Sequence, residues 1–296
     1  MFTYTNVAPS TFNLKSSNGE TNYSITNNTK PVLATTTSNC PTGFIPVPGS
    51  GTYNTNDFCV MKYEAKDAGS NIPVSTATST PWGSITQTNA IAYSSNVAGC
   101  TGCHLITEAE WLTIAQNVLS EHSNWSSNVV GSGYIYSGHN DNAPTNALAA
   151  STDDGAGYYG ETNTGGNQKR TLNLTNGQVI WDLAGNVWEW TSGQTTSGQP
   201  GIAGNIYAGW IEWSNVTTSG TLFPNVFPSG TGITGASSWT SANGIGQLIS
   251  DSNETGVSRG FLRSGTTNSP GYAGVLSLFF PPPSYSTASY GFRVSR

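Results

Sequence analysis

The sequence predicts an α+β fold with few helices and long irregular loops, on three observations. The first is a capping box at Thr107–Glu110, in which the threonine hydroxyl accepts from the Glu110 amide and Glu110 reaches back to the Thr107 amide. Apolar residues then recur on one helical face, at Trp111, Ile114, Ala115, Val118 and Leu119. The second is a series of short segments with strand and turn signals. The third is a Gly-, Ser- and Thr-rich stretch at about 191–255.

The strand signals fall into three groups along the chain. Residues 44–48 and 58–63 are apolar segments separated by a Gly/Ser/Asn turn. Residues 171–174 and 178–183 flank Asn176-Gly177, a dipeptide that favours a two-residue hairpin turn. The final predicted strands are residues 274–278 and 290–294.

Composition indicates a folded protein with an uncharged surface. Only 9% of the 296 residues are charged, against roughly a quarter in a typical soluble domain. The 9 Trp, 13 Tyr and 10 Phe indicate a core built from rings, because disordered chains are poor in aromatics. A net charge of -6 without a Lys/Arg cluster argues against nucleic acid as a partner, since phosphates must be neutralised by several cations.

The sequence favours exposure on a virion or a cell surface. Surfaces rich in Ser, Thr, Asn and Gly are typical of secreted, cell-wall or virion proteins. No apolar run is long enough to span a bilayer, so membrane insertion is not expected. No signal peptide is evident, which leaves a removed signal, another export route or assembly on a particle.

We expect two regions along the chain. Residues 1–38 are predicted to form an N-terminal arm or short strands, with a partly ordered terminus as the alternative. Residues 39–296 are predicted to form one domain, into which residues 191–255 are inserted as loops.

The four cysteines favour structural roles. Cys40 and Cys59 flank the first predicted hairpin, so a disulfide between them is plausible. Cys100 and Cys103 form a C-x-x-C, which is typical of a redox pair or half a zinc site. A zinc site needs a second ligand pair, and the nearby His104 is badly spaced for one. Structural disulfides or buried thiols are therefore favoured.

Motifs for catalysis or metal binding are scarce. No histidine has a partner at metal-ligand spacing, and His139, in a polar loop, is expected to be solvated. No G-x-S-x-G, P-loop or dinucleotide-binding fingerprint is present. Within the Trp-rich segment 181–190, Trp188 and Trp190 are expected in the core, whereas Asn186, the Val187 carbonyl and Glu189 offer oxygen ligands for a structural Ca²⁺.

Four segments together resemble the formylglycine-generating-enzyme branch of the C-type lectin fold. They are residues 107–111, 182–190, 259–263 and 291–293, in the order found in that family, and the resemblance covers roughly residues 40–296. It implies a C-type lectin-like domain of this subtype. It also implies that the Asn-x-x-Glu of the Trp-rich segment can bind Ca²⁺.

The sequence departs from the enzymes of that branch at their catalytic groups. Formylglycine-generating enzymes use a Cys pair beyond the segment that matches Arg263–Gly265, but this chain has no Cys after Cys103. Related sulfoxide synthases use a His-based iron site, which the lone histidines do not supply. The sequence therefore predicts a protein that is not an enzyme and that requires no cofactor.

A second resemblance concerns the C-terminal stretch, residues 263–293. It looks like the variable region of proteins diversified by diversity-generating retroelements, with residues 264–290 as the variable part. The resemblance implies a variable protein, from an archaeal virus or a related mobile element. Substitution at the adenines of Asn-type codons cannot yield Trp, Met, Lys, Glu or Gln, and none of these occurs between Ser264 and Tyr290.

The same stretch has the composition of a binding surface. Tyr and Phe offer large contact areas with few rotors, and Ser, Thr and Asn offer adaptable hydrogen bonds, as in antibody paratopes. Arg263, Leu276, Leu278, Gly291, Phe292 and Arg293 are expected as framework, and one of Phe279 or Phe280 is a candidate for the core. Exposure is expected for Tyr272, Tyr285 and Tyr290. The predicted ligand-binding residues are Thr266, Thr267, Asn268, Ser269, Pro270, Tyr272, Ser277, Phe279, Phe280, Pro281, Tyr285, Ser286, Thr287, Ser289 and Tyr290.

The function predicted from the sequence is ligand or receptor binding through a diversified surface patch. The expected partner is a protein or a glycan on a host or target cell. One alternative is a divergent oxidase of the formylglycine-generating type. Another is a glycan-binding or structural virion protein, although the Glu-Pro-Asn and Gln-Pro-Asp tripeptides of Ca²⁺-dependent lectins are absent.

Overall fold

The chain divides into two compact units, residues 1–39 and residues 40–296. The computed structural model describes residues 3–8, 11–15, 22–26, 32–33, 40–158, 168–195, 209–213, 239–250 and 258–296. Most of the predicted loop region 191–255 therefore lies outside the described residues. The first unit is a four-stranded antiparallel sheet in chain order, formed by β1 (Thr3–Ala8), β2 (Thr11–Lys15), β3 (Asn22–Thr26) and β4 (Val32–Leu33).

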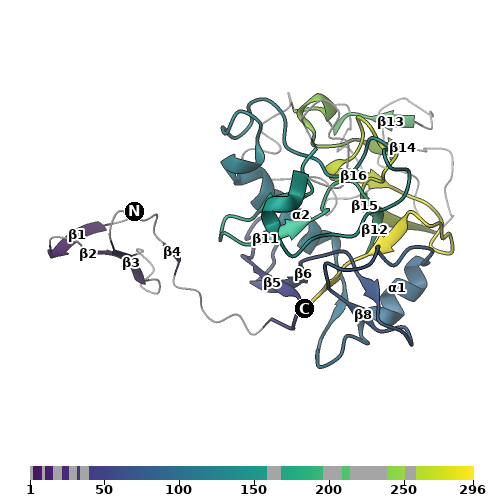
Figure 1. Cartoon of the computed structure of the whole chain (residues 1–296), viewed down its shortest axis with the longest axis horizontal. Coiled ribbons are helices and arrows are strands. Elements are labelled where there is room, and N and C mark those ends of the chain that lie inside the picture. Colours follow the sequence, from purple (N-terminus) through teal and green to yellow (C-terminus); the bar gives the residue numbers. More distant parts are fainter. Residues whose placement is uncertain are drawn as a thin grey trace. The chain divides into compact units, whose positions relative to one another are not determined.

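The second unit is built mainly from strands, with two α-helices among its described residues, so it is an α+β fold. Its six-stranded sheet has the order β13-β14-β16-β15-β12-β17. Its central strands lie side by side in Figure 1. The strands are β12 (Trp188–Thr195), β13 (Gly209–Ile211), β14 (Leu248–Ser250), β15 (Arg259–Ser264), β16 (Gly274–Phe279) and β17 (Tyr290–Phe292).

A four-stranded sheet joins the two ends of this unit. Its order is β5-β6-β18-β9, formed by β5 (Phe44–Val47), β6 (Phe58–Met61), β9 (His104–Leu105) and β18 (Val294–Ser295). Disulfides link Cys40 to Cys59 and Cys100 to Cys103. The Cys40–Cys59 disulfide holds the start of the unit to β6, beside the C-terminal strand. The small sheet of β7 (Lys66–Asp67) and β8 (Pro73–Val74) is antiparallel.

Helix α2 (Glu108–Ser120) begins as the sequence predicts. Thr107 is its N-cap, and both hydrogen bonds of the capping box are present. The Trp111 indole nitrogen donates to the Val275 carbonyl at 2.8 Å, so the apolar face of the helix packs on β16. Helix α1 (Gln87–Ser94), which lies beside β12, was not predicted. The local sequence feature that favours this helix is its N-cap, Thr86, whose hydroxyl accepts a hydrogen bond from the Asn89 amide.

The predicted Asn176-Gly177 hairpin forms with a different turn. Strands β10 (Thr171–Asn173) and β11 (Val179–Trp181) pair antiparallel as expected. The Gly177 amide donates to the Leu174 carbonyl, and the Leu174 amide donates to the Gln178 carbonyl. The positive φ of this turn, 82°, falls at Gly177. The loop therefore has three residues, with Gly177 as the bulge, and the two-residue prediction is wrong.

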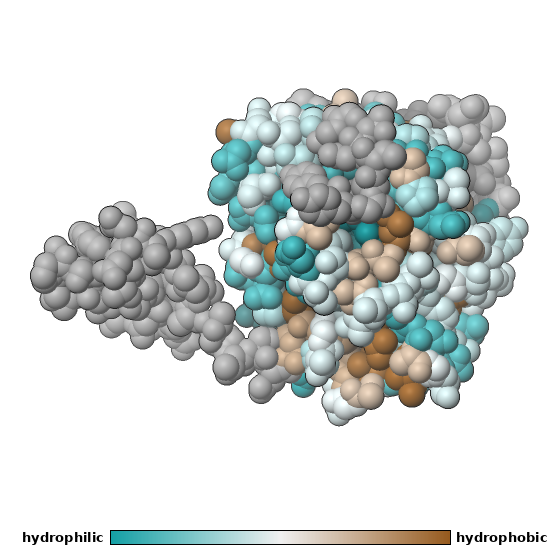
Figure 2. Space-filling model, viewed as in Figure 1, coloured by the Kyte–Doolittle hydropathy of each residue, from teal (hydrophilic) through white to brown (hydrophobic). Residues whose placement is uncertain are grey.

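The surface of the second unit reflects its composition. On the face shown in Figure 2, polar and near-neutral residues surround separate apolar groups. Trp188 and Trp190 are buried, as the sequence predicts. Among the described residues, no helix has the length and apolar character needed to cross a membrane.

Candidate functional site

Two buried arginines hold the ends of the predicted variable segment. Arg263, in β15, donates to the Glu108 carboxylate through Nε at 3.1 Å and Nη2 at 2.5 Å, and to the Leu276 carbonyl through Nη1 at 3.2 Å. It therefore joins β15, α2 and β16. Its side chain is fully buried.

Arg293, between β17 and β18, has the same role at the other end. It makes two hydrogen bonds to Glu189 on β12, at 3.0 and 2.8 Å, and both side chains are fully buried. It also donates to the carbonyls of Met61 and Trp181 at 2.8 Å. Arg263 and Arg293 are thus framework residues, as the sequence predicts. We call these two arginines with Glu108 and Glu189 the anchor residues.

Two loops lie between Arg263 and Arg293 in the sequence. The first joins β15 to β16 and spans residues 265–273. It begins at Gly265, where φ is 113° and an added Cβ would lie 2.5 Å from the Ala273 Cβ, so this position requires glycine. The loop docks on a neighbouring segment, because the Asn142 amide donates to the Thr267 carbonyl at 2.6 Å. The Thr267 hydroxyl donates to the Thr145 carbonyl at 3.1 Å.

The second loop joins β16 to β17 and spans residues 280–289. Its backbone is tied to the start of α1 and to the segment before it. The Ser84 amide donates to the Thr287 carbonyl at 2.8 Å, and the Gln87 amide donates to the Pro283 carbonyl at 3.0 Å. Residues 284–288 are exposed. The tip of this loop is therefore open to solvent while its base is fixed.

The structure divides the predicted ligand-binding residues by exposure. The exposed ones are Asn268, Pro270, Tyr285, Ser286 and Thr287, and the half-buried ones are Thr266, Tyr272, Phe279 and Ser289. The remaining six are buried: Thr267, Ser269, Ser277, Phe280, Pro281 and Tyr290. The expectation that these six are exposed was wrong, although Thr267 also lines the cleft described below.

Each buried residue has a structural task. The Ser269 hydroxyl accepts from the Thr266 amide, and the Ser277 hydroxyl donates to the Tyr272 carbonyl. Phe280 packs edge-on against Phe261, with ring centroids 5.0 Å apart. Thr267 docks the first loop, as described above.

Pro281 and Tyr290 are buried against the strands. The Pro281 carbonyl accepts from the Gly260 amide at 2.9 Å, which ties the base of the second loop to β15. The Tyr290 ring packs edge-on against Trp190 at 5.6 Å. Burial raises the pKa of Tyr290 to about 12, with the nearby Tyr285 adding to the effect.

A cleft of about 470 Å³ lies between the two loops and earlier parts of the chain. Thr267 of the first loop and Ala288 and Ser289 of the second loop line it. The other lining residues come from segment 80–84, from residues 145–147, and from Asn186 and Val187. Sequence reasoning missed segments 80–84 and 145–147 because they carry no motif and lie more than a hundred residues before the variable stretch.

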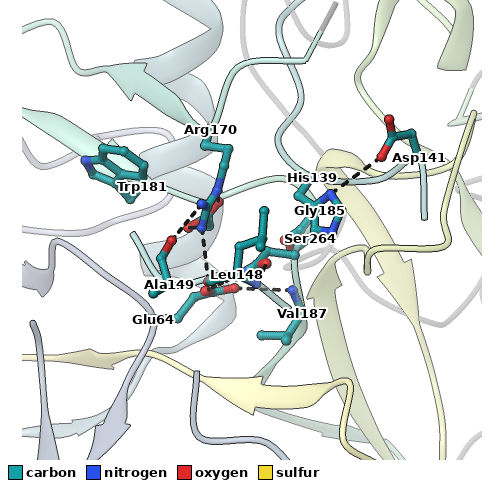
Figure 3. A network of polar contacts seen from close by, with 12 residues as sticks. Glu64, His139, Asp141, Leu148, Ala149, Arg170, Trp181, Gly185, Val187 and Ser264 are labelled. Carbon is teal, nitrogen blue, oxygen red and sulfur yellow. Dashed lines mark hydrogen bonds and ion pairs between the residues drawn. The ribbon is translucent and has the colours of Figure 1, made fainter. Parts of the chain in front are cut away.

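A buried polar network lies behind Asn186 and Val187, which form the floor of this cleft (Figure 3). The Glu64 carboxylate accepts from the Asn186 side-chain amide at 2.6 Å and from the Val187 amide at 3.3 Å. Burial, with the nearby Asp182 charge, raises the pKa of Glu64 well above its usual range. Arg170 binds both oxygens of Asp182 at 2.7 Å and donates to the Leu148 and Ala149 carbonyls. The network fixes the backbone at the cleft floor.

His139 belongs to this buried region. Its side chain is fully buried, so the expectation of a solvated residue was wrong. Nδ1 lies 3.6 Å from the Asp141 carboxylate (Figure 3), and Nε2 lies 3.3 Å from the Asn146 carbonyl. Burial lowers the pKa of His139. The ring therefore helps to position the segment that carries Asn146.

Two of the three residues predicted to bind Ca²⁺, Asn186 and Glu189, have their side-chain oxygens held by protein donors. The Asn186 side-chain oxygen accepts from the Leu148 amide at 2.8 Å. Both Glu189 oxygens are held by the positively charged Arg293. A Ca²⁺ ion takes six to eight oxygen ligands, and these oxygens are already used by protein donors.

Aromatic rings stack beside the first loop. Tyr272 stacks on Trp210 of β13 with centroids 4.3 Å apart, and Trp210 stacks on Trp188 at 5.8 Å. Phe279 packs tilted against Trp188 at 5.8 Å. The half-buried Tyr272 and Phe279 are therefore partly supported by rings that lie outside the variable stretch.

Comparison with profiles of known protein families finds no match, and comparison with curated proteins finds none. Among solved structures, the chain is similar to Treponema denticola variable protein 1, with 15% identity and a TM-score of 0.35, over 99% of this chain and 94% of that chain. It is also similar to PvdO from Pseudomonas aeruginosa, with 14% identity and a TM-score of 0.35, over 86% of this chain and 90% of that chain. TM-scores this low do not establish a shared fold.

Proposed function

We propose that this protein binds a ligand or receptor through its two C-terminal loops, on a C-type lectin-like scaffold of the formylglycine-generating-enzyme subtype. The observation that carries the proposal is that residues 263–293 combine fixed, buried ends with exposed side chains between them. Its ends are fixed by the buried pairs Arg263–Glu108 and Arg293–Glu189. Between them, exposed side chains stand on loops whose bases are hydrogen-bonded to the rest of the fold.

Such an arrangement suits a surface whose side chains change while the backbone stays. Exposed positions contribute little to stability, so substitutions there usually change it by less than about 0.5 kcal/mol. The exposed set includes Tyr285, Asn268 and Ser286, which supply a ring, an amide and a hydroxyl. Rigid rings beside small polar groups are the composition of adaptable binding surfaces.

Binding without catalysis is part of the proposal. All four cysteines are paired in disulfides, so they supply no thiol for an oxidase of the formylglycine-generating type. The proposal also includes display on a virion or cell surface and diversification of the two loops by a retroelement. The test of diversification is genomic: a near-repeat of the coding segment for residues 264–290, differing at adenines and lying near a reverse transcriptase gene.

The binding function is tested by selection from a library. Asn268, Pro270, Tyr285, Ser286 and Thr287 are randomised in the full chain, which is displayed on phage and selected against hen lysozyme as a test ligand. We expect folded binders with dissociation constants in the micromolar range or tighter.

The control library randomises five exposed residues elsewhere: Thr88, Asn89, Ser126, Ser127 and Val129. The proposal predicts that binders come mainly from the loop library. Equal yields from both libraries, or loop variants that bind only when unfolded, would count against it.

A further inference from the structure

The cleft between the two loops is uncharged and rich in hydroxyl groups. Neither a charged nor an aromatic side chain is among the residues that line it. Its polar side chains come from separate segments: Thr80 and Ser84 before α1, Thr145 and Asn146 beside the first loop, and Ser289 in the second loop. Side chains from several parts of the sequence thus converge on one space of about 470 Å³.

These polar side chains are available to a ligand. Within the parts of the chain that the structure describes, the hydroxyls of Thr80, Ser84, Thr145 and Ser289 and the side-chain amide of Asn146 make no hydrogen bond to protein. Their backbones, in contrast, are held. The Asn146 carbonyl interacts with His139, and the Ser289 carbonyl accepts from the Trp188 amide at 2.8 Å. The cleft therefore combines fixed backbone with free polar side chains.

We infer that this cleft binds a neutral sugar unit, such as a hexopyranose within a glycan. The inference rests on the proposed binding function and names the class of ligand for it. Each sugar hydroxyl donates and accepts a hydrogen bond, as serine and threonine hydroxyls and asparagine amides also do. The volume lies within the range of small-molecule sites, about 300 to 1,000 Å³.

Charge and shape argue against other ligand classes. A carboxylate or phosphate in the cleft would meet no cationic side chain among the residues that line it. Behind the cleft, the Glu64 carboxyl group contacts Asn186 and Val187, and the Arg170 guanidinium group is paired with Asp182. Small residues such as Pro81, Ala147 and Ala288 also line this cleft. They suit the C–H edges of a sugar ring.

The inference is tested by binding of defined sugars to the full chain. The probes are the methyl glycosides of glucose, galactose and mannose, with N-acetylneuraminic acid and glucose 6-phosphate as anionic comparators. Saturation-transfer NMR and titration calorimetry measure binding. We expect at least one neutral glycoside to bind with a dissociation constant of about 1 mM or tighter, and the anionic sugars to bind at least tenfold more weakly.

Variants locate the site. The double variant Asn146→Ala/Ser289→Ala removes two free polar groups, and we expect the dissociation constant to rise about tenfold or more. Ala288→Tyr fills the cleft and should abolish binding. The matched control Asn89→Ala/Ser132→Ala changes the same residue types at exposed positions that line neither the cleft nor the two loops, and should leave binding unchanged. Melting temperatures confirm that each variant is folded.

Three results would overturn the inference: none of the neutral glycosides binds in the millimolar range, the anionic sugars bind equally well, or the double variant binds as the wild type does. If the loop library still yields lysozyme binders, the proposed binding function stands while the sugar site fails. If neither experiment gives binding, both fail.

Discussion

Arg293 and Glu189 form a buried ion pair in which each charge is compensated by hydrogen bonds. Both side chains are fully buried, and the guanidinium group makes four hydrogen bonds, two to the carboxylate and two to backbone carbonyls. A buried pair of this kind adds little net stability over apolar residues of similar size. Removing one partner, however, leaves a charge without compensation. These residues therefore specify where the second loop ends.

Substitution of Arg293 tests this role. We expect Arg293→Met to lower the free energy of unfolding by about 3 to 5 kcal/mol, because Glu189 would remain buried and unpaired. The double variant Arg293→Met/Glu189→Met removes both charges and should be less destabilised than the single variant. Urea denaturation followed by tryptophan fluorescence measures both. A double variant at least as destabilised as the single one would contradict the account.

At the scale of elements, local signals were readable from the sequence and long-range ones were not. The capping box at Thr107 was predictable because its atoms lie within four residues. Helix α1 was missed because tertiary contacts support it: the Gln87 side-chain amide donates to the Thr191 and Gly193 carbonyls on β12 at 2.7 Å. Helices are often stabilised more by packing than by local propensity.

A polar cluster joins three elements and should respond to pH. His104 of β9 contacts the Glu110 carboxylate of α2 at 3.0 Å, and the Ser295 hydroxyl of β18 donates to the same carboxylate at 2.8 Å. The hydrogen bond to Glu110 raises the pKa of His104 despite its partial burial. For Glu110, burial alone would raise the pKa, but hydrogen bonds from His104 and Thr107 outweigh it and lower the pKa.

The pH dependence has a definite sign. Because the pKa of His104 in the folded protein lies above the ordinary histidine value of 6.5, its contribution to stability is complete below that value. The contribution is lost as pH rises through the folded pKa. The contribution of Glu110 is present above 4.5 and is lost as pH falls through its lowered pKa. We expect the wild type to lose more stability than His104→Asn between pH 6 and 8, measured by thermal unfolding. Parallel curves for the two proteins would rule out this role for His104.

At the scale of the whole molecule, the sequence predicted β5, β6, β10, β11, β16, β17 and the framework arginines. It did not predict the central strands β12 and β15 or the burial of the loops. Burial depends on partners far away in sequence. Phe279 and Phe280 are adjacent, and only contact with Phe261 shows that Phe280 is the buried one. Likewise, the walls of the cleft at Thr80 and Asn146 come from segments without a motif. Composition indicated the kind of surface, and the fold determined which side chains form it.

The central claim is that a fixed framework holds exchangeable side chains, and a complete substitution scan of residues 264–290 tests it most directly. Every single substitution is displayed on yeast, and the fraction of folded protein is measured by resistance to protease. The account predicts that Asn268, Pro270, Tyr285, Ser286 and Thr287 accept most residues, whereas Ser269, Ser277, Phe280 and Tyr290 accept few. Equal tolerance at the exposed and the buried positions, or intolerance at the exposed ones, would contradict it.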